Sequence, residues 1–105
     1  MADEPLAIGL SCDSTDEYRL TVSGELDVMG APILTGKLAK VFHDEAASVV
    51  IDLRDLSFID STGLGVLISA KHRANATGVP IKMELPEGQA RYAFEITGLA
   101  DVFEN

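Results

Sequence analysis

The sequence predicts an α/β fold, with a mixed, mostly parallel four-stranded sheet and amphipathic helices packed on it in the order ββαβαβα. Three observations support this prediction. The chain has 105 residues, of which 47% are hydrophobic, which suits one globular unit with its own core. Strand and helix periodicities alternate after a leading hairpin. The β-branched run Val49–Ile51 is typical of a parallel strand buried on both faces. Residues 1–105 are therefore expected to form a single domain.

The first two elements are predicted to form an antiparallel hairpin. Apolar residues alternate with others over residues 6–10, which favours a strand facing the core, and again over residues 18–22. The polar segment 11–17 between them has the composition of a turn. Gly24 is expected to end the second strand, and residues 25–27 to form a loop.

A helix is predicted to follow this loop. Pro32 suits a first helical turn, where its missing N–H costs nothing. Four apolar residues then share one helical face: Leu34, Leu38, Val41 and Phe42. The third strand, residues 48–53, contains the β-branched run. A helix between two parallel strands makes a right-handed crossover the expected connection.

The remaining elements continue the alternation. Residues 61–75 are predicted to form the second helix, 80–85 a strand and 87–97 the third helix. The proline at the start of the strand suggests either an edge position or a strand beginning. Gly98 suits a helix C-terminus, and residues 99–103 are expected to form a short packing turn.

The charge balance points to a protein partner. The chain carries 17 acidic and 8 basic side chains, a net charge of −9. Nucleic acids and anionic membrane surfaces would repel it, so neither is expected as a partner. A protein with a basic face is the expected one.

The sequence favours a soluble, cytoplasmic protein. Cys12 is the only cysteine, so neither an intramolecular disulfide nor a cysteine-based metal cluster is expected. The acidic N-terminus does not resemble a signal peptide. Apolar stretches are shorter than a membrane span requires.

The segment most able to carry chemistry is the start of the predicted second helix. Its first residues are preceded by Asp60 and include Ser61, Thr62, Gly63 and Gly65. A helix N-terminus offers unpaired N–H groups and a partial positive charge, so a phosphate on a hydroxyl there would be accepted. The glycines are expected to let another protein approach closely. On this view, Gly63→Ala would stabilise the isolated helix by up to ~1 kcal/mol and would still weaken the binding of a partner.

A purely structural interpretation stays open, because Asp, Ser and Thr are also the preferred N-caps of helices. An enzyme is disfavoured, since no nucleophile–base pair is visible. The Asp-Ser-Thr-Gly segment has no second copy to act as an aspartic-protease dyad, and the glycines do not complete a dinucleotide-binding fingerprint. His43 and His72 lack ligand spacing and are expected to be solvated, so no metal site is predicted.

The sequence resembles the STAS domain of bacterial anti-sigma factor antagonists. The resemblance is carried by residues 49–67, with the Leu-Ser-Phe-Ile-Asp-Ser-Thr-Gly-Leu-Gly core at 56–65, and by Gly-Glu-Leu-Asp at 24–27. It extends over most of the chain, from about Leu6 to Phe103. It implies a STAS fold.

The resemblance also implies a mechanism without catalysis or cofactor. In this family the serine after the motif aspartate is phosphorylated by the anti-sigma factor, an ATP-binding serine/threonine kinase; here it corresponds to Ser61, with Thr62 as the second choice. Asp60 and Asp27 correspond to the carboxylates near that site, and with Thr62, Gly63 and Gly65 they are the expected partner contacts. The unphosphorylated antagonist binds the kinase and frees a sigma factor, and a phosphatase is a further possible partner. The alternative is a STAS domain that serves as a constitutive, unphosphorylated subunit of a lipid-transport or other multiprotein complex.

Overall fold

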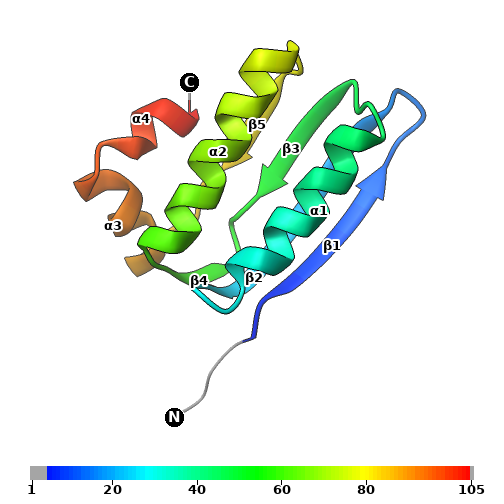
Figure 1. Cartoon of the computed structure of the whole chain (residues 1–105). Coiled ribbons are helices and arrows are strands. Elements are labelled where there is room, and N and C mark those ends of the chain that lie inside the picture. The colour runs from blue at the N-terminus through cyan, green and yellow to red at the C-terminus, as the bar shows by residue number, and fades with distance from the viewer. Residues whose placement is uncertain (1–4, 105) are drawn as a thin grey trace.

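The computed structural model describes residues 5–104 and confirms the mixed α/β fold (Figure 1). In chain order, the elements of this part are β1 (Ala7–Cys12), β2 (Glu17–Leu26), α1 (Ala31–His43), β3 (Ser48–Asp52), β4 (Leu56–Ile59), α2 (Ser61–Thr77), β5 (Ile81–Glu84), α3 (Gln89–Ile96) and α4 (Leu99–Glu104).

The sheet has five strands, so the prediction of four was wrong by one. Its main path is β1-β2-β3-β5, in which only the β1–β2 pair is antiparallel. The additional strand, β4, pairs in parallel with the second half of β2. No strand was predicted there, because Leu56 to Ile59 do not alternate between apolar and polar side chains; only Leu56 and Ile59 are buried.

Strand β2 is longer than predicted because Gly24 does not end it. The strand continues to Leu26, and its register with β4 shifts between Gly24 and Glu25. Gly24 has a φ of +88°, a conformation that suits glycine and allows the strand to bend. The bend lets one strand pair with β3 over its first half and with β4 over its second. Two of the three residues expected in a loop, Glu25 and Leu26, therefore belong to the sheet.

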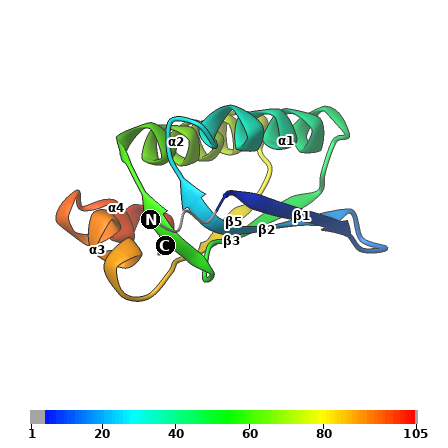
Figure 2. The same cartoon turned by 90° about the horizontal axis from the view of Figure 1, so that it is seen from below.

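Helices α1 and α2 lie side by side over one face of the sheet, while α3 and α4 lie beside β4 and β5 (Figures 1 and 2). The predicted apolar face of α1 packs inward, with Phe42 half-buried at its edge. The largest fully buried side chains are Phe94, Leu20, Leu26, Leu34, Ile51, Leu53, Leu67, Val22, Val41, Val49 and Pro86. Phe94 meets Phe103 of α4 edge to face, with ring centroids 5.8 Å apart, so the predicted packing turn is a helix.

Strand β1 contributes less to the core than its alternation predicts. Leu6 and Ile8 are half-buried against the core and Leu10 is 37% exposed. β1 is an edge strand of the main path, so neighbours cover it from one side only. No helix within residues 5–104 is long and apolar enough to cross a membrane.

An ion network joins three neighbouring strands on the face of the sheet away from α1 and α2. Arg19 of β2 donates to Asp52 of β3 at 2.9 Å and to Glu84 of β5. Arg54 donates to both carboxylate oxygens of Asp52, at 2.9 and 2.8 Å. Asp52 is buried, at 6% exposure, and these bonds satisfy it. The network therefore links β2, β3 and β5 on this face of the sheet.

Candidate functional site

The candidate site lies at the carboxyl ends of β2 and β4. These strands are parallel neighbours, with Leu26 opposite Ile59, and the Asp60 N–H donates to the Leu26 carbonyl at 3.2 Å. Asp27 and Asp60 are the next residues along each strand, so the fold brings them to one edge of the sheet, as predicted. The carboxyl ends of parallel strands are a common place for functional residues.

Asp60 is the N-cap of α2. Its backbone is extended, its Oδ1 accepts the Gly63 N–H at 2.9 Å, and its carbonyl accepts the Leu64 N–H at 3.0 Å. Capping is therefore supplied by Asp60. Ser61 and Thr62 follow as the first two helical residues; both are exposed, and neither hydroxyl forms a hydrogen bond within residues 5–104. The structural interpretation accounts for Asp60 but leaves both hydroxyls without a role in the fold.

Asp27 shapes the start of α1. Its Oδ1 accepts the N–H groups of Met29 and Gly30, both at 3.0 Å, and its carbonyl accepts the Ala31 N–H at 2.8 Å. This half-buried carboxylate holds the β2–α1 loop in a fixed turn beside Asp60. Asp27 thus has a structural task as well as its place near Ser61.

The two glycines of α2 have different surroundings, which corrects one expectation. Gly63 is buried, and a Cβ there would lie 2.6 Å from the Leu26 carbonyl oxygen and 2.9 Å from Cγ1 of Ile59. Its missing side chain makes room for β2 and β4, so Gly63→Ala is not expected to stabilise the folded domain, whatever it does for the isolated helix. Gly65 is exposed with open space at its Cβ position, and remains available to a partner.

An exposed apolar surface beside Asp27 was missed by sequence analysis. Val28, Met29 and Ile33 are 63%, 78% and 52% exposed, and we call them the apolar patch. Met29 and Ile33 also line a hollow of about 460 Å³ that Asp27 borders. A signal was present in the sequence: Val28 and Met29 are large apolar residues between the predicted loop and the predicted helix, and Ile33 falls outside the apolar face of α1.

The chemical groups of the site suit the binding of an anion or of another protein. It combines accessible hydroxyls, a helix N-terminus that favours anions, and an apolar patch. No group of His, Cys, Asp and Glu in the described part of the chain could hold a metal ion. His43 and His72 are exposed on α1 and α2, as predicted.

Comparison with known proteins agrees with this geometry. The model of the family described as "Mlab, STAS domain" matches residues 11–104. The anti-sigma-B factor antagonist of Bacillus subtilis (strain 168) is 34% identical over 89 residues, which cover 85% of this chain and 81% of that relative. These matches include both strand ends and the start of α2.

Solved structures share the fold. An anti-sigma factor antagonist from Mycobacterium paratuberculosis superimposes with a TM-score of 0.81 at 25% identity, covering 97% of this chain and 86% of that one. The anti-sigma factor antagonist SpoIIAA in its unphosphorylated form gives 0.79 at 20% identity, covering 94% and 86% of the two chains. In its phosphorylated form the same protein, from Bacillus, gives 0.73 at 21% identity, covering 94% and 89%. The chain therefore belongs to the family of STAS-domain proteins that includes the anti-sigma factor antagonists.

Proposed function

We propose that this chain, as one STAS domain, is an anti-sigma factor antagonist that is switched by phosphorylation at Ser61. In the unphosphorylated state it binds an anti-sigma factor serine kinase and thereby frees a sigma factor. Phosphorylation by that kinase, with ATP supplied by the partner, releases it. The chain itself catalyses nothing and needs no cofactor. The observation that carries the proposal is the exposed Ser61 hydroxyl, which stands beside an N-cap already provided by Asp60.

The start of α2 suits a phosphate without disturbing the fold. The Asp60 side chain and carbonyl take the N–H groups of Gly63 and Leu64, which leaves the N–H groups of Ser61 and Thr62 for an anion. The helix N-terminus stabilises an exposed anion by roughly 0.3–1 kcal/mol. The modified domain is therefore expected to stay folded.

The same phosphate opposes the complex. A neutral hydroxyl in the interface becomes a group with a charge of roughly −1.5 to −2, next to Asp60 and close to the loop that Asp27 begins. The apolar patch beside it would be part of the contact, where charge is costly to desolvate. A loss of ~3 kcal/mol weakens binding more than a hundredfold, which is enough for release.

Ser61 is preferred over Thr62 because of where each side chain lies. Both are exposed, but Thr62 lines the groove between α1 and α2, while Ser61 is the residue next to the capping carboxylate. Thr62 remains the second choice.

The test is phosphorylation by the cognate anti-sigma factor kinase with ATP, read by mass spectrometry, for the wild type, Ser61→Ala and Thr62→Ala. We expect one phosphate on the wild type and on Thr62→Ala, and none on Ser61→Ala. Calorimetry should then show that Ser61→Ala binds as tightly as the unmodified wild type, and that the phosphorylated protein binds more than a hundredfold more weakly.

Two results would reject the proposal. One is phosphate on Thr62 alone. The other is equal affinity of phosphorylated and unphosphorylated protein, which would instead support the constitutive-subunit alternative. The phosphatase remains a proposed partner, tested by adding candidate phosphatases to the modified protein and following loss of the phosphate.

A further inference from the structure

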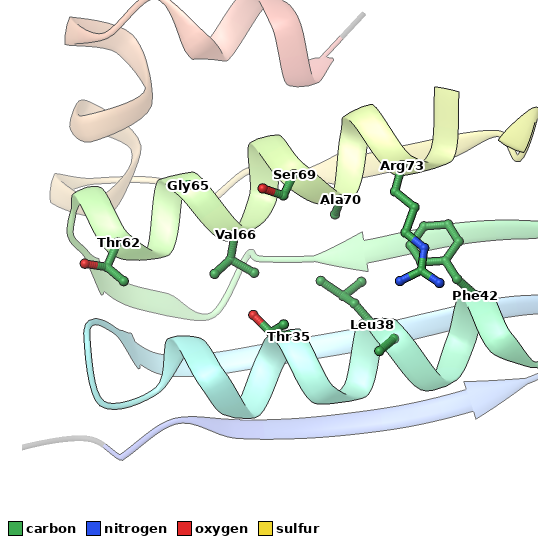
Figure 3. A pocket seen from close by; sticks show the side chains of 10 residues that line it. Thr35, Leu38, Phe42, Thr62, Gly65, Val66, Ser69, Ala70 and Arg73 are labelled. Atoms are coloured by element: carbon green, nitrogen blue, oxygen red, sulfur yellow. The ribbon is translucent and has the colours of Figure 1, made fainter. Parts of the chain in front are cut away.

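A groove runs between α1 and α2, from Thr62 next to the candidate site to Arg73 in the later part of α2. It has a volume of about 420 Å³, and Figure 3 shows side chains from both helices pointing into it. Its lining residues are Thr35, Leu38, Ala39, Phe42, Thr62, Gly65, Val66, Ser69, Ala70 and Arg73. Leu38 and Ala70 form a buried floor, while most of the rim is exposed. The groove is thus apolar at its base and open to solvent along its length.

The charge of these two helices is opposite to that of the chain. Neither α1 nor α2 contains an aspartate or glutamate, although the chain has 17; together they carry two lysines on α1, Lys71 and Arg73 on α2, and both histidines. Among the residues that the structure describes, only Lys40 of these four cations forms an ion pair, with Asp44. Arg73 lines the groove, with its guanidinium 4.9 Å from the centre of the Phe42 ring. Helices α1 and α2 thus carry a net positive charge on an acidic protein, and Arg73 is the cation that lines the groove itself, so an acidic occupant is its electrostatic complement.

The shape of the groove favours a helix as its occupant. Backbone groups of α1 and α2 are satisfied within each helix, so the groove offers no edge for an added strand. Its floor is concave, which a flat membrane surface cannot reach. The lining from Thr62 to Arg73 spans twelve residues of α2, a rise of about 16 Å, which is about three helical turns. Small residues on both walls, Ala39, Gly65 and Ser69, allow a third helix to approach closely.

We propose that the groove between α1 and α2 is a docking surface for an acidic amphipathic helix of a protein partner. The apolar side of that helix would lie on Leu38 and Val66, and its acidic side would face Arg73. The groove begins at Thr62, next to Ser61, and runs along both helices to Arg73. The proposal concerns the unphosphorylated chain and does not depend on the Ser61 switch.

The test uses the full, unphosphorylated chain and two synthetic peptides of about 14 residues, the length that spans the groove with a turn to spare. Both carry leucines at helical spacing; one has glutamates and the other lysines at all remaining charged positions. We expect the acidic peptide to bind at least tenfold more tightly, and to shift amide NMR signals of the groove lining. Raising the ionic strength from about 0.05 to 0.5 M should weaken the binding of the acidic peptide, since salt then screens the attraction between charges beyond a few ångströms.

Three variants locate the binding. Gly65→Leu should fill the groove and abolish binding, because its Cβ meets open space and the core is undisturbed. Arg73→Glu should weaken binding at least tenfold. Lys82→Glu makes the same charge change on an exposed residue of the opposite sheet face, and should change affinity less than twofold. Thermal melts confirm that each variant is folded.

Several outcomes overturn the proposal. These are equal binding of the two peptides, no binding of either, full binding by Gly65→Leu, or binding of phosphatidylglycerol vesicles in place of the acidic peptide. Because no kinase takes part, failure here would leave the Ser61 switch intact, and failure of that switch would leave this result intact.

Discussion

At the residue scale, the surroundings of Gly63 and Gly65 lead to opposite expectations for the same substitution. Gly63→Ala places a Cβ 2.6 Å from a backbone oxygen, so α2 must shift; overpacking of this kind costs about 1–3 kcal/mol and outweighs the gain in helix propensity. Gly65→Ala meets open space and should stabilise the fold by up to ~1 kcal/mol. Urea unfolding measures the change in the free energy of unfolding for each variant, and each variant is the control for the other. Equal effects would show that Gly63 does not hold α2 against β2 and β4.

A second residue-scale prediction concerns Asp60. Asn retains an oxygen that can accept the Gly63 N–H, so Asp60→Asn should change the free energy of unfolding by less than ~1 kcal/mol. It removes the carboxylate next to Ser61, and we expect impaired phosphorylation or partner binding. Thermal melts paired with the kinase assay separate the two effects. A large loss of stability with normal phosphorylation of the folded protein would limit Asp60 to capping.

Much of the site at this scale was accessible from the sequence. The positions of Asp27, Asp60 and Ser61 follow from a motif and from the rule that loops after parallel strands share an edge. The different roles of the two glycines did not follow, because they depend on Leu26, which is 37 residues away from Gly63 in the chain. The apolar patch was missed because exposure depends on which neighbours cover a residue, and sequence periodicity does not give that.

At the element scale, the network around Asp52 joins β2, β3 and β5. The pKa of Asp52 is held below its usual value of 3.8, first by hydrogen bonds from the Arg54 guanidinium, and against the effect of burial. A carboxylate with a lowered pKa in the folded state stabilises the fold above its unfolded pKa. That contribution is lost as the pH falls below about 4, toward the lower folded pKa.

Asp52→Asn should therefore destabilise the protein at pH 7 by about 1.5–3 kcal/mol, the range for a hydrogen bond to a charged group. The difference from wild type should shrink as the pH is lowered from about 4 to 2. Chemical unfolding at several pH values measures it. Asp55→Asn, an exposed neighbour, is the matched control and should stay within ~0.5 kcal/mol of wild type. A difference that is constant with pH would exclude the ionised carboxylate as the cause.

The elements themselves were largely predictable, and the exceptions have physical reasons. The ends of α2 and β3, and the start of α1 near Pro32, fall close to their predicted positions because local sequence signals and periodicity agree there. Strand β4 is too short to show the two-residue alternation that is typical of a strand. The continuation of β2 through Gly24 depends on pairing with β4. Because β2 and β4 pair with each other, missing strand β4 and ending β2 too early at Gly24 are linked errors.

At the scale of the whole molecule, the sequence showed a net charge of −9 but not its distribution. The fold collects α1 and α2, which lack acidic residues, into one layer, and leaves the acidic side chains on the loops, strands and later helices. The net charge alone does not reveal such a layer, because the layer forms only when two helices that are separate in the sequence lie side by side (Figure 1). The direction of approach of a charged partner is thus a property of the fold.

The attachment of β4 to a single strand has a consequence for local opening of the molecule. Within the described residues, β3 is hydrogen-bonded to a strand on each side, whereas β4 pairs with the end of β2 alone, over three residue pairs. Backbone amides of β4 should therefore exchange with deuterium at least about tenfold faster than those of Val49 to Ile51, a difference of ~1.4 kcal/mol in opening free energy. Native-state exchange followed by NMR measures both sets in one sample, and equal protection would contradict the expectation. Since Ser61 lies two residues beyond β4, such fluctuations would present the proposed acceptor serine to a kinase while the rest of the sheet stays closed.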